Sequence, residues 1–93
     1  MPAYLVVAVT YRNKGWTDAY RRDVPALVAA YGGRYLAKSL DPERLEGEGD
    51  KPDTLAILEF PTAEAARTML ASPEYRPYAE ARTQGAQTTI FLL

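Results

Sequence analysis

Residues 54–78 read TLAILEFPTAEAARTMLASPEYRPY and contain three successive structural signals. The first part, a largely apolar run that stops at Pro61, predicts a β-strand. Thr62 can cap the helix that follows, because its hydroxyl can accept a hydrogen bond from a free backbone N–H. Ser72-Pro73-Glu74 then predicts the start of a second, shorter helix. We expect the rest of the chain to pair with this unit or to pack on it.

The segment Tyr4–Tyr11 is almost continuously apolar and too short for a buried helix, so we interpret it as a strand. Side chains alternate along a strand, and here both faces would be apolar. One face would carry Leu5, Val7 and Val9, and the other Tyr4, Val6 and Ala8. Both faces of this strand are therefore expected to be covered by protein.

A helix is predicted over Thr17–Tyr31, because its apolar residues recur at helical spacing. They are Tyr20, Val24, Leu27, Val28 and Tyr31. Thr17 can cap this helix, and Gly32-Gly33 can end it because glycine tolerates a positive φ.

The remaining strands are less regular in sequence. A second strand is predicted from Arg34–Ala37 and expected to resume near Arg44–Glu46, with Asp41-Pro42 as an interruption. A polar turn, 47–53, leads into the strand of residues 54–60. Gln87–Leu93 predicts a last strand that is again apolar on both faces.

The order of these elements is strand, helix, strand, strand, helix, strand, with an additional helix before the last strand. That order is typical of a ferredoxin-like βαββαβ fold of the α+β class. Since the chain has 93 residues, we interpret residues 1–93 as one domain.

The chain contains several short motifs: Leu58-Glu59-Phe60-Pro61, Glu64-Ala65-Ala66, Ser72-Pro73-Glu74-Tyr75, Tyr31-Gly32-Gly33-Arg34-Tyr35-Leu36 and Leu45-Glu46-Gly47. Together they resemble the DUF1330 family within the dimeric α+β barrel superfamily. The resemblance implies a dimeric α+β barrel and no agreed activity. The segment Lys38–Pro42 departs from the family pattern, so the local strand register is open.

The composition excludes several classes of function. The chain has 11 basic and 12 acidic residues without a basic cluster, so a nucleic-acid partner is not expected. It has no cysteine and no histidine, which removes thiol nucleophiles, imidazole catalysis and zinc fingers. No phosphate-loop glycine spacing or calcium-loop pattern is present, and we expect no cofactor and no metal.

The first residues, MPAYLVVAV, lack the basic segment and the full-length apolar core of a signal peptide. No stretch approaches the ~20 apolar residues of a membrane span. We therefore expect a cytoplasmic protein without a membrane partner.

Two charged residues at strand ends are candidate ligand-binding residues. Arg34 can clamp a ligand carboxylate, and Glu59 can act as a base where the protein covers it. The structural alternative is that Arg34 forms an ion pair with Glu46 or Glu59, and that Glu59 meets solvent at the end of its strand.

Tyrosine is abundant, with seven residues, and tyrosine combines an apolar ring with a polar tip. A pocket wall could include Tyr4, Tyr11, Tyr35, Tyr75 and Tyr78, although packing in the core or at an interface is the alternative. A pocket is expected between the sheet and residues 72–78, with Arg34, Glu59, Tyr75 and Tyr78 as the ligand-binding candidates; no catalytic residue is assigned. Trp16 is expected to pack against Tyr20 or Arg21.

Three hypotheses for function follow. One is a small-molecule-binding or accessory domain, and another is a purely structural partner of a second protein. The remaining hypothesis is a cofactor-independent enzyme that acts on a small aromatic or carbonyl metabolite, since the superfamily resemblance implies monooxygenases and lactone isomerases. Whether the protein is an enzyme stays open, because the absence of histidine weighs against acid–base catalysis without excluding it.

A homodimer is expected on physical grounds. Two main helices and one short helix can cover only one face of a four-stranded sheet, while three strands are apolar on both faces. An uncovered second face would exceed the apolar area that monomers usually expose, and a twofold partner would cover it.

Overall fold

The computed structural model describes residues 1–93 and contains four strands and three helices. The elements are β1 (Ala3–Tyr11), α1 (Thr17–Ala30), β2 (Arg34–Ser39), β3 (Thr54–Phe60), α2 (Ala63–Leu70), α3 (Arg76–Gly85) and β4 (Ala86–Leu92). The expected additional helix is present as α3; with 10 residues it is longer than α2, which has 8.

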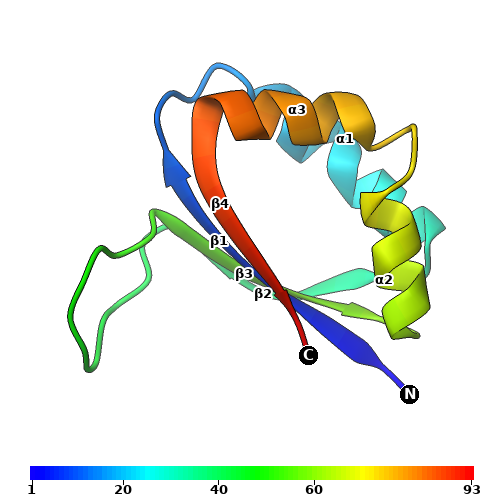
Figure 1. Ribbon diagram of the computed structural model, residues 1–93, viewed down its shortest axis with the longest axis horizontal. Coiled ribbons are helices and arrows are strands. Elements are labelled where there is room, and N and C mark those ends of the chain that lie inside the picture. The colour runs from blue at the N-terminus through cyan, green and yellow to red at the C-terminus, as the bar shows by residue number, and fades with distance from the viewer.

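The strands form one antiparallel sheet in the order β2-β3-β1-β4. This is the ferredoxin-like α+β arrangement, in which the first and third strands lie at the centre. All three helices lie on the same side of the sheet, while the loop between β2 and β3 extends away from them (Figure 1). The ends of the chain meet, since Tyr4 and Leu93 exchange two backbone hydrogen bonds.

Two-residue alternation in β1 separates the two faces of the sheet. Leu5 and Val9 face the helices and are buried, whereas Val6 and Ala8 face the other side. In β4 the same alternation leaves the Phe91 side chain 62% exposed on the side without helices. The prediction that both faces of β1 are apolar is therefore confirmed, and only one of them is covered by this chain.

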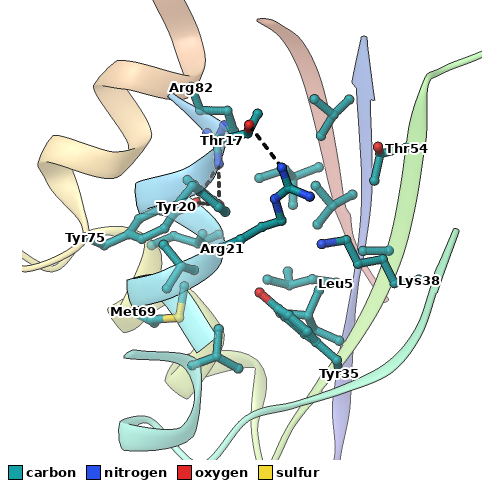
Figure 2. A pocket seen from close by; sticks show the side chains of 18 of the residues that line it. Leu5, Thr17, Tyr20, Arg21, Tyr35, Lys38, Thr54, Met69, Tyr75 and Arg82 are labelled. Carbon is teal, nitrogen blue, oxygen red and sulfur yellow. Dashed lines mark hydrogen bonds between the residues drawn. The ribbon is translucent and has the colours of Figure 1, made fainter. Parts of the chain in front are cut away.

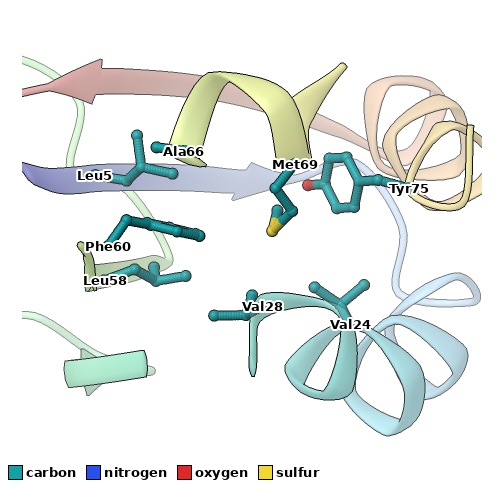
Figure 3. Packing of buried hydrophobic residues seen from close by; sticks show 8 residues of the cluster. All are labelled: Leu5, Val24, Val28, Leu58, Phe60, Ala66, Met69 and Tyr75. Atoms are coloured by element: carbon teal, nitrogen blue, oxygen red, sulfur yellow. The ribbon is translucent and has the colours of Figure 1, made fainter. Parts of the chain in front are cut away.

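The hydrophobic core lies between the sheet and the helices (Figure 3). Eight buried residues form one cluster: Leu5, Val24, Val28, Leu58, Phe60, Ala66, Met69 and Tyr75. Ala66 is fully buried, and its small side chain allows α2 to approach β1 and β3 closely. The core thus occupies the α2 end of the inner face.

The cap of α2 is built as the sequence predicts, whereas α3 begins only at Arg76, after the predicted Ser72-Pro73-Glu74 start, and has no side-chain cap. The Thr62 hydroxyl accepts a hydrogen bond from the Ala65 N–H at 3.0 Å. Ser72 donates to the Met69 carbonyl and accepts from the Tyr75 N–H, so its side chain fixes the turn from α2 to α3. A single straight helix over the sheet is thereby prevented.

Two local predictions are wrong. Thr17 does not cap α1, because it is already the first helical residue and its hydroxyl donates to the Lys14 carbonyl. No strand resumes at residues 44–46, where the chain has no regular structure. Pro42 has no backbone N–H to donate to a ladder, which is consistent with β2 ending at Ser39.

Gly32 and Gly33 are required for the connection from α1 to β2. Gly32 has a φ of +81°, which favours glycine, as predicted for the end of the helix. A Cβ at Gly33 would lie 2.6 Å from the Phe60 ring, so only a glycine fits beside this core residue. The connection and the core therefore constrain each other.

The structure contains no helix with the length and apolar character needed to span a membrane.

Replacing Phe60 with Ala is expected to lower the free energy of unfolding by about 3–5 kcal/mol, because it leaves a cavity in the core. Leu45→Ala is the control, since Leu45 lies 86% exposed in the loop before β3 and should change stability by less than about 0.5 kcal/mol. Chemical denaturation measures both variants. Similar losses of unfolding free energy in the two variants would contradict the placement of Phe60 in the core.

Candidate functional site

A cavity of about 80 Å³ lies between the inner face of the sheet and the helices. Its floor is apolar and comes mainly from alternate residues of the central strands, including Leu5, Val7 and Ala56. Val24 of α1 and Met69 of α2 line it from the helix side. The cavity exists because the chain turns at Ser72, so that α3 does not continue the line of α2 across the sheet.

Aromatic rings form one wall of the cavity. Trp16 packs edge-on against Tyr20 with ring centroids 5.5 Å apart, as the sequence predicts, and Tyr11 lies 5.9 Å from Trp16. Tyr20 in turn contacts Tyr75 edge-on at 6.1 Å. These contacts join the end of β1 and the loop after it to α1 and to the residue before α3, and they hold the rings in fixed positions.

The polar end of this wall is a hydrogen-bonded cluster of Tyr20, Tyr75 and Arg82, which we call the phenol–guanidinium cluster. Arg82 Nη1 donates to the Tyr75 hydroxyl at 2.5 Å and to the Tyr20 hydroxyl at 3.4 Å. The two hydroxyls also bond to each other. Arg82 Nε is buried and has no partner. No carboxylate forms an ion pair with Arg82.

The protons of this cluster can be counted. Arginine only donates, so both phenol oxygens accept from Arg82. The bond between Tyr20 and Tyr75 uses one of the two O–H groups, and no other acceptor bonds to either hydroxyl. One phenol O–H is therefore free to donate, from a cluster whose members all line the cavity.

Burial, with a smaller effect from Tyr20, raises the pKa of Tyr75 well above its usual value near 10. The Tyr75 side chain is only 2% exposed. Tyr75 is therefore a neutral phenol at physiological pH, and the cluster carries the positive charge of Arg82.

Three further polar side chains, one from α1 and two from β2, point toward the cavity (Figure 2). Arg21 extends from α1 and Lys38 from β2 toward the same space, and the Tyr35 hydroxyl points into it from below. The Arg21 guanidinium donates to the Thr17 hydroxyl at 3.2 Å. Burial raises the pKa of Tyr35 to about 12, so this phenol is also neutral at physiological pH.

A β-bulge places Tyr35 and Lys38 on the same face. Residues three apart in a regular strand point to opposite faces. In β2, Tyr35 pairs with Leu58 and Lys38 pairs with Ala56, and the register shifts between them so that Leu36 is an extra residue. Both partners in β3 line the cavity. The bulge thus turns Lys38 toward the cavity, a frequent role of bulges near binding sites.

The ligand-binding residues predicted from the sequence lie in different places. Tyr75 lines the cavity. Tyr78 lies beside the wall, where its ring contacts Tyr20 at 6.4 Å and its hydroxyl donates to Asp23. Hydrogen bonds to Asp23 from Arg22 first, and then from Tyr78, lower the pKa of this carboxyl to about 2.

Arg34 and Glu59 lie on the opposite face of the sheet and do not line the cavity. They are register partners and form an ion pair with 2.9 Å between Arg34 Nε and Glu59 Oε1. The expectation of one wall shared with Tyr75 is thereby corrected, because Glu59 alternates with Leu58, whose side chain faces the helices. The ion-pair alternative for Arg34 is the observed one.

Sequence reasoning missed Tyr20, Arg82, Lys38 and Arg21 as site residues. Tyr20 belongs to the apolar stripe of α1, as its spacing predicts, but its hydroxyl bonds within a polar cluster. Arg82 stands seven residues after Tyr75, two helical turns away, and this spacing was a usable signal. For Lys38 the sequence offers no such signal, because the orientation of its side chain depends on the β-bulge in β2.

The cavity and its surroundings lack the donors of a metal site. No group of three or more Asp, Glu, His or Cys side chains is placed to hold a metal ion. None of the lining residues is acidic. The available chemistry is hydrogen bonding from phenols, positive charge and aromatic contact.

The fold and the cavity define a ferredoxin-like α+β protein with a site under its helices. The family described as "Domain of unknown function (DUF1330)" matches residues 2–93, and the chain belongs to this family. No curated protein matches the chain.

Three solved structures are similar over nearly the whole chain. RPA0582 from Rhodopseudomonas palustris, a protein of unknown function, has a TM-score of 0.82 and 23% identity, covering 99% of this chain and 80% of that protein. SnoaB from Streptomyces nogalater, described as a cofactor-independent oxygenase, has a TM-score of 0.68 and 19% identity, covering 99% of this chain and 90% of that protein. A dimeric ferredoxin-like protein of unknown function from Jannaschia sp. has a TM-score of 0.66 and 11% identity, covering 100% of this chain and 98% of that protein. At these identities the similarity shows the fold.

The raised pKa of Tyr75 predicts a pH dependence of stability. Below pH 10 the Tyr75 hydroxyl is protonated in both the folded and the unfolded protein. Above pH 10 the unfolded chain releases this proton while the folded protein keeps it. Stability is therefore lost as the pH rises toward the pKa of Tyr75 in the folded protein. The free energy of unfolding of the Tyr75→Phe variant is therefore expected to fall by about 1 kcal/mol less than that of the unsubstituted protein for each pH unit above 10. Urea denaturation between pH 8 and 11 measures this difference, and parallel losses for the two proteins would contradict a buried neutral hydroxyl.

Proposed function

We propose that this protein binds a small molecule in the cavity under its helices and acts as a homodimer. One observation carries the proposal of binding. The cavity combines an apolar floor with a few converging polar groups, among them the phenol–guanidinium cluster with its free O–H and its buried, unpartnered Arg82 Nε. A core serving only stability is not expected to leave such groups unsatisfied beside an empty space.

The apolar outer face of the sheet supports the homodimer. Its side chains, which no helix of this chain covers, include Val6, Ala8, Leu55, Ile57 and Phe91. Ile57 is 39% exposed, and so large an apolar sheet face is typical of an interface. The Jannaschia protein with this fold is described as dimeric. A second copy related by a twofold axis would cover identical faces together.

Binding can be tested with phenol as a single-ring probe, because the only tryptophan, Trp16, lines the cavity and reports through its fluorescence. Phenol is expected to change this fluorescence saturably. Ala56→Leu should abolish the change because it fills the floor of the cavity, whereas Ala29→Leu on the exposed side of α1 should leave it intact. Equal responses from both variants would place any binding elsewhere and refute the proposal.

The dimer can be tested by placing a charge on the outer face. Ile57→Asp is expected to shift the protein from dimer to monomer in sedimentation velocity at micromolar concentration, since a carboxylate cannot be desolvated there without a partner. Leu45→Asp in the exposed loop is the matched control and should remain dimeric. A monomeric unsubstituted protein would contradict the proposed assembly.

A second candidate function is cofactor-independent catalysis on an aromatic or carbonyl substrate. It is favoured by the phenol–guanidinium cluster, which offers both a proton donor and a fixed positive charge to a substrate oxygen that becomes negative. SnoaB, which shares the fold, is described as a cofactor-independent oxygenase.

Oxygen uptake with hydroquinone, a single-ring phenol, tests this second candidate. An oxygenase of this kind would consume O2 with that probe, and Tyr75→Phe would reduce the rate at least tenfold if the cluster stabilises the substrate oxygen. Binding of phenol without oxygen consumption in the presence of hydroquinone would contradict the catalytic candidate and leave small-molecule binding as the proposed function.

A further inference from the structure

The charges around the cavity are of one sign. Arg21, Lys38 and Arg82 line it, and no Asp or Glu does. The chain as a whole carries a formal charge of −1, so the excess of cations at this site is local. A concave site with positive charge on its walls raises the local concentration of anions.

These cations are poorly compensated within the protein. Lys38 forms no ion pair, and the Arg82 guanidinium donates hydrogen bonds only to phenol hydroxyls. The Asp18 carboxylate lies 3.6 Å from Arg21, but its side chain is almost fully exposed and such a pair contributes little. The cavity therefore retains unused positive charge for a bound group.

From these observations we infer that the ligand is a small aromatic carboxylate, whose charge is held by Lys38 and Arg21 and whose ring rests among the aromatic side chains of the cavity. This inference rests on the proposed binding function and names the class of its ligand. Carboxylates match the planar fork of arginine and the point charge of lysine. Five aromatic residues line the cavity: Tyr11, Trp16, Tyr20, Tyr35 and Tyr75.

The size of the cavity limits the ligand to a single ring. Its volume of about 80 Å³ is roughly half that of the ~150 Å³ cavity that admits benzene. Figure 2 shows the Arg21 side chain extending into this space, where its only hydrogen bond is to the Thr17 hydroxyl. Arg21 must swing aside for a ring to enter, and a carboxylate gives its guanidinium a stronger partner than Thr17.

The neutral phenols complete the recognition. Since the Tyr35 and Tyr75 hydroxyls keep their protons at neutral pH, they add no negative charge that would repel a carboxylate. The free O–H of the phenol–guanidinium cluster can donate to a second oxygen on the ring, such as a hydroxyl substituent. The site thus distinguishes acids from their uncharged analogues by charge and from aliphatic acids by ring contact.

The test uses benzoate and its neutral isostere benzamide, with calorimetry and Trp16 fluorescence at pH 7. Benzoate is expected to bind at least tenfold more tightly than benzamide. Lys38→Met, which keeps the apolar stem and removes the charge, should weaken benzoate about tenfold and leave benzamide unchanged. Lys51→Met is the matched control, because Lys51 pairs with Asp41 in the loop before β3, and it should affect neither probe.

The outcomes separate this inference from the proposed function. Equal affinities for benzoate and benzamide, or a preference for benzoate that survives Lys38→Met, would overturn the anionic ligand while leaving a binding cavity. If phenol, benzoate and benzamide all fail to bind, both the inference and the proposed function are wrong. Cyclohexanecarboxylate, which has the charge without the aromatic ring, should bind more weakly than benzoate; equal binding would refute the aromatic class.

Discussion

Two-residue alternation in the central strands is the constraint on which the rest of the molecule depends. β1 and β3 present apolar side chains on both faces, yet the chain has helices for only one face. The covered face becomes the core and the cavity, and the other face is not covered by any helix of this chain. The same alternation separates the Arg34–Glu59 ion pair from the cavity, because both residues occupy positions between those that face the helices.

The site arises where regular structure is interrupted. The turn at Ser72 ends α2 and sets α3 at a new angle, which leaves space above the sheet and brings Tyr75 and Arg82 to its edge. The bulge in β2 then turns Lys38 toward the same space. Neither interruption is needed for a ferredoxin-like sheet. Their common effect is a cavity with phenols and cations on its walls, which supports a role in binding rather than in structure alone.

The fold was predictable from the sequence because its signals are local. Apolar runs, Thr62, the Gly32-Gly33 pair and Ser72-Pro73 each specify an element within a few residues. The site was less predictable, because it depends on pairing between distant segments. Helical spacing indicates Tyr75, but the positions of Arg34 and Glu59 at strand ends do not reveal which face of the sheet their side chains occupy. Lys38 required the register of β2 against β3, and one extra residue changes that register.

A crystal structure with 4-bromobenzoate would show directly whether the cavity binds an aromatic carboxylate, because the anomalous signal of bromine locates the ring. We expect one bromine peak between α1 and the inner face of the sheet, with the carboxylate within hydrogen-bonding distance of Lys38 Nζ or the Arg21 guanidinium. Arg21 should then no longer bond to Thr17. Bromine found only on the outer face of the sheet, or a bound ring whose carboxylate points away from both cations, would contradict it.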